Sequence, residues 1–162
     1  MRWLRQIGLA VEERAVETLA AGARHWLPAW REMPPHLATG EAGERAALFY
    51  LRRKGYVAVA RRWSSGEAAG DIDLVAWHGP TLCFVEVKTR TARDQTPAEA
   101  AVDRSKRNHL RRLANAYLRH LPQDSAPQVR FDVVSVYLLG RGRREFEHFE
   151  NAFPLSARSL DS

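Results

Sequence analysis

The sequence predicts an α/β fold in which helices flank a mixed central β-sheet. Strand-like apolar runs fall into two groups, and amphipathic helical patterns precede the first group and separate it from the second. The elements therefore follow the order α-β-β-β-α-β-β, which is typical of a mixed sheet covered by helices. With 162 residues, of which 45% are hydrophobic, the chain is long enough to bury one independent core.

Residues 1–39 are expected to form an N-terminal helical extension. They contain a loose apolar stripe at helical spacing, which is broken at Pro28 and again at Pro34-Pro35. Such a helix could pack on the main domain or dock a protein partner, and both interpretations stay open. We expect the main domain to span residues 40–155 and a short tail to follow at residues 156–162.

The first helix of the main domain is predicted to begin near Thr39 and to end at Lys54-Gly55. Its apolar residues recur three and four positions apart, and Glu44 lies on the same stripe. Because an inward-facing carboxylate needs a partner, we expect Lys88 or a hydrated metal ion next to Glu44. Residues 56–63 then alternate in the manner of a strand.

Two further strands are predicted at residues 70–76 and 82–88, joined by a turn at Gly79-Pro80. A hairpin closed at this turn places Asp73 directly opposite Glu86. The Cβ atoms of directly opposed residues lie roughly 4.5–5.5 Å apart, and like charges in that position are destabilising. A bound divalent cation would remove the repulsion between the two carboxylates.

The same register places Asp71 opposite Lys88, on the face that carries Asp73 and Glu86. A Glu-x-Lys sequence on a strand is more often a solvated salt bridge, worth ~1 kcal/mol or less. The acidic face is thus either such a salt bridge or a site for Mg²⁺ or Mn²⁺ with Asp73 and Glu86 as ligands. In the second case Lys88 would orient the attacking water or stabilise negative charge on a phosphate.

A second helix is predicted to begin at Thr96-Pro97-Ala98-Glu99, where a cap, a proline and a glutamate stand at the required positions. Its apolar stripe extends this helix to about Arg119. Residues 130–139 are predicted to form another strand, and residues 146–149 the last one.

The second predicted helix is strongly basic outside its apolar stripe. The whole chain carries a net charge of +6 and a pI near 10.1, which favours a polyanionic partner. A solvated face is the simpler interpretation, but the excess of cations over one acid, Asp103, favours contact with a phosphate backbone. The residues expected to bind nucleic acid are Arg90, Arg104, Lys106, Arg107, Arg111 and Arg112.

The single cysteine, Cys83, excludes an intramolecular disulfide and fits a reducing compartment. We expect it to be a buried thiol on the face opposite the carboxylates. The chain has no apolar run long enough to span a membrane, so we expect a cytoplasmic protein without a membrane partner.

Several short segments, taken together, are typical of one protein family. They are Gly43-Glu44, Tyr50-Leu51, Gly55-Tyr56, residues 70–76, residues 84–90, Arg130-Phe131-Asp132 and Asn151-Ala152-Phe153. These segments resemble the largely uncharacterised bacterial YraN family, which is identified as a member of the restriction-endonuclease-like PD-(D/E)xK superfamily, similar to archaeal Holliday-junction resolvases. The resemblance implies a restriction-endonuclease-like fold, a catalytic triad of Asp73, Glu86 and Lys88, and an additional acid at Glu44.

Two positions depart from the family pattern, because Asp71 stands where the family usually has glutamate and Arg62 where it commonly has asparagine. The resulting hypothesis is a Mg²⁺-dependent or Mn²⁺-dependent endonuclease that hydrolyses DNA and recognises branched shape or free ends. RNA is an alternative partner, and superfamily relatives often act as dimers, which makes a homodimer an open option. A non-catalytic nucleic-acid-binding module that keeps the nuclease fold is the alternative function.

Overall fold

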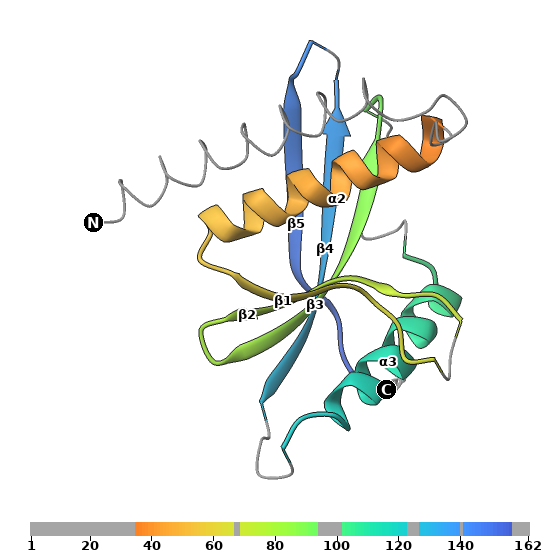
Figure 1. The fold of residues 1–162 in the computed structure, drawn as a ribbon, viewed down its shortest axis with the longest axis vertical. Helices are drawn as coiled ribbons and strands as arrows, with labels where there is room; N and C mark the ends of the chain where they lie inside the picture. Colours follow the sequence, from red (N-terminus) through yellow and green to blue (C-terminus); the bar gives the residue numbers. More distant parts are fainter. Residues whose placement is uncertain (1–34, 67–68, 94–101, 123–126, 140, 157–162) are drawn as a thin grey trace, which may run out of the picture.

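The computed structural model describes residues 35–66, 69–93, 102–122, 127–139 and 141–156. In this part of the chain a five-stranded mixed sheet is flanked by helices (Figure 1), which confirms the predicted α/β fold and the order of its elements. The elements, in chain order, are α2 (Pro35–Arg53), β1 (Val57–Trp63), β2 (Ile72–His78), β3 (Thr81–Arg90), α3 (Arg104–Leu118), β4 (Gln128–Leu138) and β5 (Arg144–Phe153).

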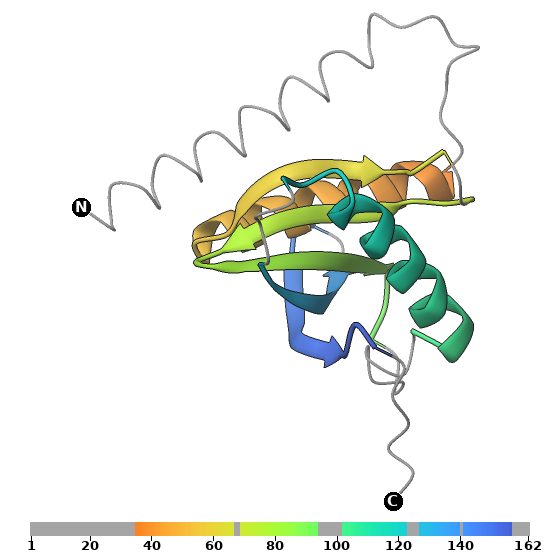
Figure 2. The same ribbon diagram turned by 90° about the horizontal axis from the view of Figure 1, so that it is seen from below.

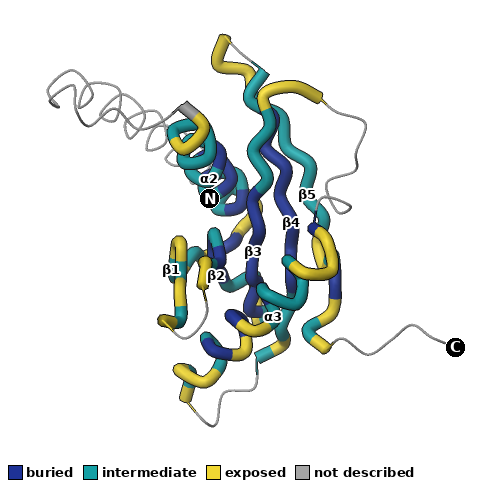
Figure 3. The backbone as a smooth tube through the Cα atoms, turned by 90° about the vertical axis from the view of Figure 1, so that its right-hand side faces the viewer, coloured by how far each residue is buried: buried dark blue, intermediate teal, exposed yellow. Residues whose placement is uncertain are grey.

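The strands lie side by side in the order β1-β2-β3-β4-β5. Neighbours are antiparallel except for β3 and β4, which run parallel because α3 carries the chain back between them. The β2–β3 hairpin closes at Gly79-Pro80, with His78 opposite Thr81, as predicted. Figure 3 shows β3 and β4 as buried central strands, whereas Val57 and Val59 of the edge strand β1 are exposed.

Apolar side chains fill both faces of the sheet, and each face has its own helix (Figures 1 and 2). Successive side chains of a strand point to opposite faces. Phe84 of β3 accordingly packs with Leu110 and Leu113 of α3, and its neighbours Cys83 and Val85 pack on the α2 side. The predicted burial of Cys83 is therefore confirmed.

Two glycines fix how α2 ends and how it docks. Gly55 follows the helix with φ of 94°, a conformation that residues other than glycine adopt only at a cost, so the helix ends where the sequence predicts. Gly43 faces β3 so closely that a Cβ atom there would lie 1.8 Å from Thr89 Oγ1. This close approach sets the next residue, Glu44, beside the end of the β2–β3 hairpin.

The start of α2 differs from the prediction, because the helix begins at Pro35 and not near Thr39. Proline suits the first turn of a helix, where no intrahelical partner for its missing N–H is needed. Residues 1–34, and with them most of the predicted N-terminal extension, lie outside the described residues. No helix within the described ranges is both long enough and apolar enough to cross a membrane.

The start of α3 also differs. Asp103 has an extended backbone, with φ of −65° and ψ of 170°, and its side chain accepts a hydrogen bond from the Lys106 N–H at 2.8 Å. It is therefore the N-cap of a helix that begins at Arg104. The prediction of one continuous helix from Thr96 is wrong at residues 102–103, which are not helical, and the predicted cap itself lies outside the described residues.

Candidate active site

The acidic site lies where β2 and β3 part. Their ladder follows the predicted register and ends at the pair Leu74–Val85. One residue further along β2, Asp73 Oδ2 accepts a hydrogen bond from the Val87 N–H at 2.6 Å. This side chain therefore satisfies an amide that a backbone carbonyl would bind in a longer ladder. The carboxylates of Asp73 and Glu86 interact at this opening, as the sequence predicts.

The predicted pair of Asp71 with Lys88 does not form. Asp71 precedes β2, whose first residue, Ile72, pairs with Trp63 of β1. Lys88 pairs in the other direction, with Ser135 of β4. The two strands diverge because β2 stays with β1 while β3 continues along β4, so the hairpin register cannot extend to this pair.

Glu86 is buried, with 4% of its surface exposed, and two lysines contact its carboxylate. Lys88 Nζ lies 2.9 Å from Oε1, and Lys106 Nζ, which comes from α3, lies 3.1 Å from Oε2. Despite this ion pair, Oε2 accepts no hydrogen bond. The buried oxygen is thus neutralised by a nearby positive charge without the geometry of a hydrogen bond.

Asp73 is electrostatically strained. Burial raises its pKa to about 7, and the Glu86 carboxylate and, less strongly, Glu44 push the pKa in the same direction. The Val87 N–H and the Lys106 ammonium act against this rise. A group of like charges with such a displaced pKa is typical of functional sites, because a structural carboxylate normally has enough donors to stay ionised.

Glu44 has a partner that the sequence analysis did not identify. Its carboxylate forms a two-pronged ion pair with Arg62, with distances of 2.8 Å from Nε to Oε2 and 3.1 Å from Nη2 to Oε1. The expected contact with Lys88 is therefore not the one observed. Arg62 has φ of 47°, a conformation that costs a non-glycine residue about 1–3 kcal/mol and that the packing must hold in place.

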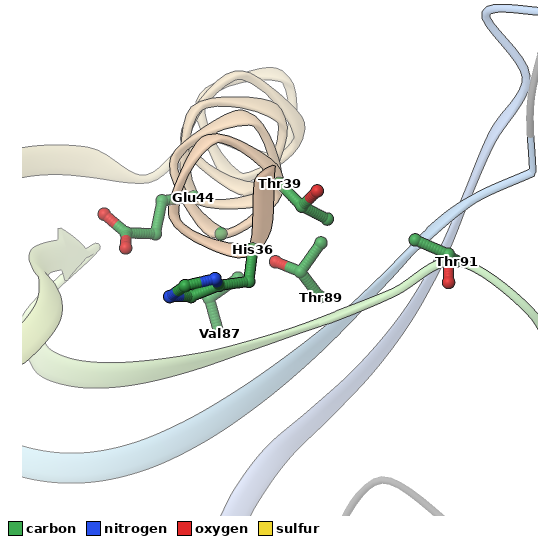
Figure 4. A pocket seen from close by; sticks show the side chains of 7 residues that line it. His36, Thr39, Glu44, Val87, Thr89 and Thr91 are labelled. Atoms are coloured by element: carbon green, nitrogen blue, oxygen red, sulfur yellow. The ribbon is translucent and has the colours of Figure 1, made fainter. Parts of the chain in front are cut away.

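Glu44 also lines an open pocket of about 400 Å³ between the start of α2 and the end of β3 (Figure 4). His36 and Glu44 reach it from the helix, and Val87 and Thr89 form its floor on the strand side. Because Val87 also binds Asp73 through its backbone, the pocket adjoins the acidic site.

The six cations predicted to bind nucleic acid lie on α3 and at the end of β3, and several of them contact other groups of the protein. Lys106 contacts Glu86, as described above. Arg107 Nε donates to the Val102 carbonyl at 2.7 Å, and Arg111 Nε donates to the Pro154 carbonyl at 2.9 Å, so both guanidinium groups are tied to the α3 end of the domain. The other three are Arg104 and Arg112, which are exposed, and Arg90, which is partly buried at the end of β3.

A second charged cluster surrounds Asp132, whose side chain is fully buried in β4. The carboxylate accepts hydrogen bonds from the Tyr56 hydroxyl and from the Asn151 N–H, both at 3.0 Å, and Arg130 Nε lies 2.9 Å from Oδ1. His148 Nε2 lies 3.2 Å from Oδ2. Burial pushes the pKa of Asp132 upward, but the contacts with His148, Asn151 and Arg130 outweigh it and leave the pKa below its ordinary value.

Sequence reasoning named Asp132 only within the family resemblance and missed its partners. The available signal was a charged residue at the centre of an apolar strand, which requires neutralising neighbours. Arg130 lies two positions away on the same strand, but the other neighbours are 16 to 76 positions from Asp132.

The residues of the acidic site fit a hydrated divalent cation better than a closed metal cage. Among the described residues, no group of three or more His, Cys, Asp and Glu side chains is arranged to hold a metal ion. Mg²⁺ needs only one or two carboxylates, since it keeps several of its waters. Asp73, with its raised pKa, and Glu86, with its unsatisfied Oε2, provide those two groups.

Comparison with known proteins gives the family of the chain. The uncharacterised protein family UPF0102 matches residues 43–136. A UPF0102 protein of Koribacter versatilis is 48% identical over 123 residues, which cover 76% of this chain and 84% of the relative. A Porphyromonas gingivalis relative is 43% identical over 124 residues, covering 76% and 89% of the two chains.

A third relative, from Symbiobacterium thermophilum, is 47% identical over 117 residues, which span 70% of this chain and 94% of the relative. The segment that matches the family, residues 43–136, includes α2 from Gly43, the whole β2–β3 hairpin, α3 and most of β4. The chain therefore belongs to the uncharacterised protein family UPF0102, which is the YraN family that its motifs resemble.

Proposed function

We propose that this protein is a metal-dependent endonuclease that hydrolyses DNA phosphodiester bonds. The observation that carries the proposal is the convergence of Asp73, Glu86 and Lys88 at the opening of the hairpin, with one carboxylate raised in pKa and the other left with an unsatisfied buried oxygen. A structural salt bridge would be expected to satisfy both carboxylates.

In this mechanism Asp73 and Glu86 bind Mg²⁺ or Mn²⁺, which supplies charge neutralisation and water activation when it is present. Lys88 lies 2.9 Å from Glu86, so its ammonium would stand close to a phosphate bound at this cation. There it stabilises the negative charge that develops on the phosphate oxygens or orients the attacking water. Glu44 supports the site from α2 while Arg62 holds its carboxylate in place.

The positive charge of the protein supports a polyanionic substrate. Arg104 and Arg112 are exposed on α3, the helix that also supplies Lys106 to the acidic site. Cations in such positions bind the phosphate backbone without reading bases, so DNA shape or free ends would direct the protein to its substrate. The same contacts would allow RNA to bind.

The test is cleavage of duplex, single-stranded, flapped and branched DNA in the presence of Mg²⁺, Mn²⁺ or EDTA. We expect metal-dependent cleavage that falls by about 10²–10⁴-fold in Lys88→Met and in Asp73→Asn, because each change removes one charged group of the reaction. Asp71→Asn is the matched control, since Asp71 carries a carboxylate close in sequence but lies outside β2.

Cleavage that survives both Lys88→Met and Asp73→Asn would show that the activity comes from elsewhere. The absence of metal-dependent cleavage on the whole panel would reject the proposal. In that case the two ammonium groups that already lie beside Glu86 favour the second candidate, a nucleic-acid-binding module without turnover. That module would bind DNA in a salt-dependent manner, lose affinity in the double variant Arg104→Gln/Arg112→Gln and keep it in Lys88→Met.

A further inference from the structure

We propose that Lys106 is a built-in counter-ion that holds the cation position of the acidic site and leaves it when a divalent cation binds. The inference rests on the proposed function for the identity of the cation site. It adds a residue from α3 whose ammonium and the metal exclude each other.

The position of Lys106 supports this role. Its Nζ lies 3.1 Å from Glu86 Oε2, the buried oxygen that accepts no hydrogen bond. The contact is therefore an ion pair without the alignment of a hydrogen bond, and a metal that binds this oxygen must displace the ammonium. Lys88 contacts the other oxygen, Oε1, so the two lysines do not compete for one atom.

The charge of Lys106 acts on both carboxylates of the site. It contacts Glu86 directly, and it also counteracts the rise in the pKa of Asp73 that burial and Glu86 cause. A single positive charge that interacts favourably with Asp73 and with Glu86 does what a divalent cation would do there. The ammonium therefore neutralises the pair while no metal is bound.

The side chain of Lys106 can also move away from Glu86. Its backbone is fixed, because its N–H donates to the Asp103 side chain in the cap of α3. Its side chain, by contrast, is 33% exposed, and its ammonium is carried on a flexible four-carbon stem. A dication and an ammonium at one carboxylate repel each other, so metal binding would turn Lys106 outward, where a phosphate could neutralise it.

This arrangement couples two binding events. Without a polyanion, a bound metal displaces the Lys106 ammonium from Glu86, and the positive charge of this ammonium then has no negative partner. With a phosphate present, the ammonium gains a partner, and metal and nucleic acid then strengthen each other's binding by the same factor. Lys106 would thus make the protein bind its metal weakly until nucleic acid is in place.

The first experiment measures Mn²⁺ binding to the full chain without nucleic acid, by the paramagnetic resonance of free Mn²⁺. We expect Lys106→Met to bind Mn²⁺ about tenfold more tightly than the unaltered protein, because the competing charge is gone. Lys106→Arg keeps the charge and should bind Mn²⁺ like the unaltered protein. The control is Arg112→Met, which removes an exposed cation of the same helix. Arg112 Nη2 lies 3.5 Å from His109 Nδ1 and not beside Glu86, so this variant shows how much the loss of any positive charge on α3 changes Mn²⁺ affinity.

Equal Mn²⁺ affinity of Lys106→Met and the unaltered protein, or an equal gain in Arg112→Met, would overturn the inference, as would the absence of Mn²⁺ binding in every variant. The gain should also disappear when Glu86→Gln is combined with Lys106→Met, since the two residues act on one position. Thermal unfolding provides a second readout. Lys106→Met should melt at a lower temperature without metal, and Mn²⁺ should raise its melting temperature more than that of the unaltered protein.

The coupling is tested with a short duplex whose phosphorothioate linkages resist hydrolysis. Mn²⁺ should tighten duplex binding by the unaltered protein, and this factor should shrink several-fold in Lys106→Met. Arg112→Met should weaken duplex binding equally with and without Mn²⁺, so that its factor stays that of the unaltered protein. The results of these binding experiments can be distinguished from the result of the cleavage assay. Tighter Mn²⁺ binding by Lys106→Met without any cleavage would support the counter-ion and reject the nuclease, and unchanged Mn²⁺ affinity with normal cleavage would do the opposite.

Discussion

Asp73 and Asp132 are both buried carboxylates of the central sheet, yet their surroundings have opposite effects on their charge. Asp132 is surrounded by donors from Tyr56, Asn151 and Arg130, which keep its pKa below the ordinary value. Asp73 accepts the Val87 N–H but faces other carboxylates, and its pKa rises to about 7. One site is satisfied and stabilises the fold, whereas the other stores electrostatic repulsion that a cation would relieve.

The same substitution at the two positions should therefore have opposite signs. Asp132→Asn should lower the free energy of unfolding by about 2–4 kcal/mol near pH 7.5, because it removes the buried charge that Tyr56, His148 and Arg130 contact, although Arg130 keeps its ion pair with Glu150. Urea unfolding followed by circular dichroism measures this loss. A decrease below about 1 kcal/mol would show that the cluster around Asp132 does not carry the stability assigned to it.

Asp73→Asn should instead raise the free energy of unfolding, by about 1–3 kcal/mol near pH 8, because it removes the charge that burial and Glu86 disfavour. The gain depends on pH. Since the pKa of Asp73 is about 7 in the folded protein and 3.8 ordinarily, the folded state holds this proton more tightly, and the unaltered protein loses stability as the pH rises between these values.

The difference between Asp73→Asn and the unaltered protein should therefore be small near pH 4 and grow up to about pH 8. Asp132→Asn should show the reverse trend in acid. The contribution of Asp132 is present above its ordinary pKa and is lost as the pH falls through its lower folded value, so the cost of the substitution should shrink there. Melting temperatures across this range would contradict the comparison if both variants followed the same trend.

Tyr56→Phe tests one donor of the satisfied cluster. Its hydroxyl donates to Asp132 Oδ2 at 3.0 Å, and the ring remains buried in either residue. The loss of one hydrogen bond to a charged group should cost about 1–2 kcal/mol in urea unfolding. The rate of DNA cleavage by the folded protein should stay unchanged, because the Tyr56 hydroxyl binds Asp132 and not Asp73 or Glu86.

The smallest effect is expected at Arg62. Arg62→Asn removes the ion pair with Glu44, which is partly exposed and worth ~1 kcal/mol or less. It also relieves part of the strain at φ of 47°, since asparagine tolerates this conformation better than arginine. The free energy of unfolding should change by less than about 1 kcal/mol. A loss above about 2 kcal/mol would mean that Glu44 depends on Arg62 as strongly as Asp132 depends on its partners.

The sequence predicted the acidic hairpin well because its determinants are local. The two-residue turn at Gly79-Pro80 fixes which residues of β2 and β3 face each other, and strand alternation then assigns the faces. The limit of this reasoning lies at Asp71, where β2 follows β1 and not β3. Strand divergence depends on how the whole sheet twists, which a local pattern does not report.

The helix boundaries show a similar limit. Thr96-Pro97-Ala98-Glu99 and Asp103 both carry the chemistry of an N-cap, and the sequence pattern favoured the first. The helix that packs on the sheet starts after Asp103, since its apolar side chains Leu110 and Leu113 must reach the core around Phe84. Packing against the sheet thus requires a helix that begins at Arg104, whereas Thr96 to Glu99 lie outside the described residues.

By itself the sequence determined the order of helices and strands, the register of the β2–β3 hairpin and the meeting of Asp73 with Glu86, because turn residues and side-chain periodicity act over a few positions. Only the tertiary structure decided the partners of the charges. Arg62 rather than Lys88 binds Glu44, Lys106 reaches Glu86 from α3, and distant donors enclose Asp132. These contacts join elements far apart in the chain, and their geometry depends on how the helices dock on the sheet.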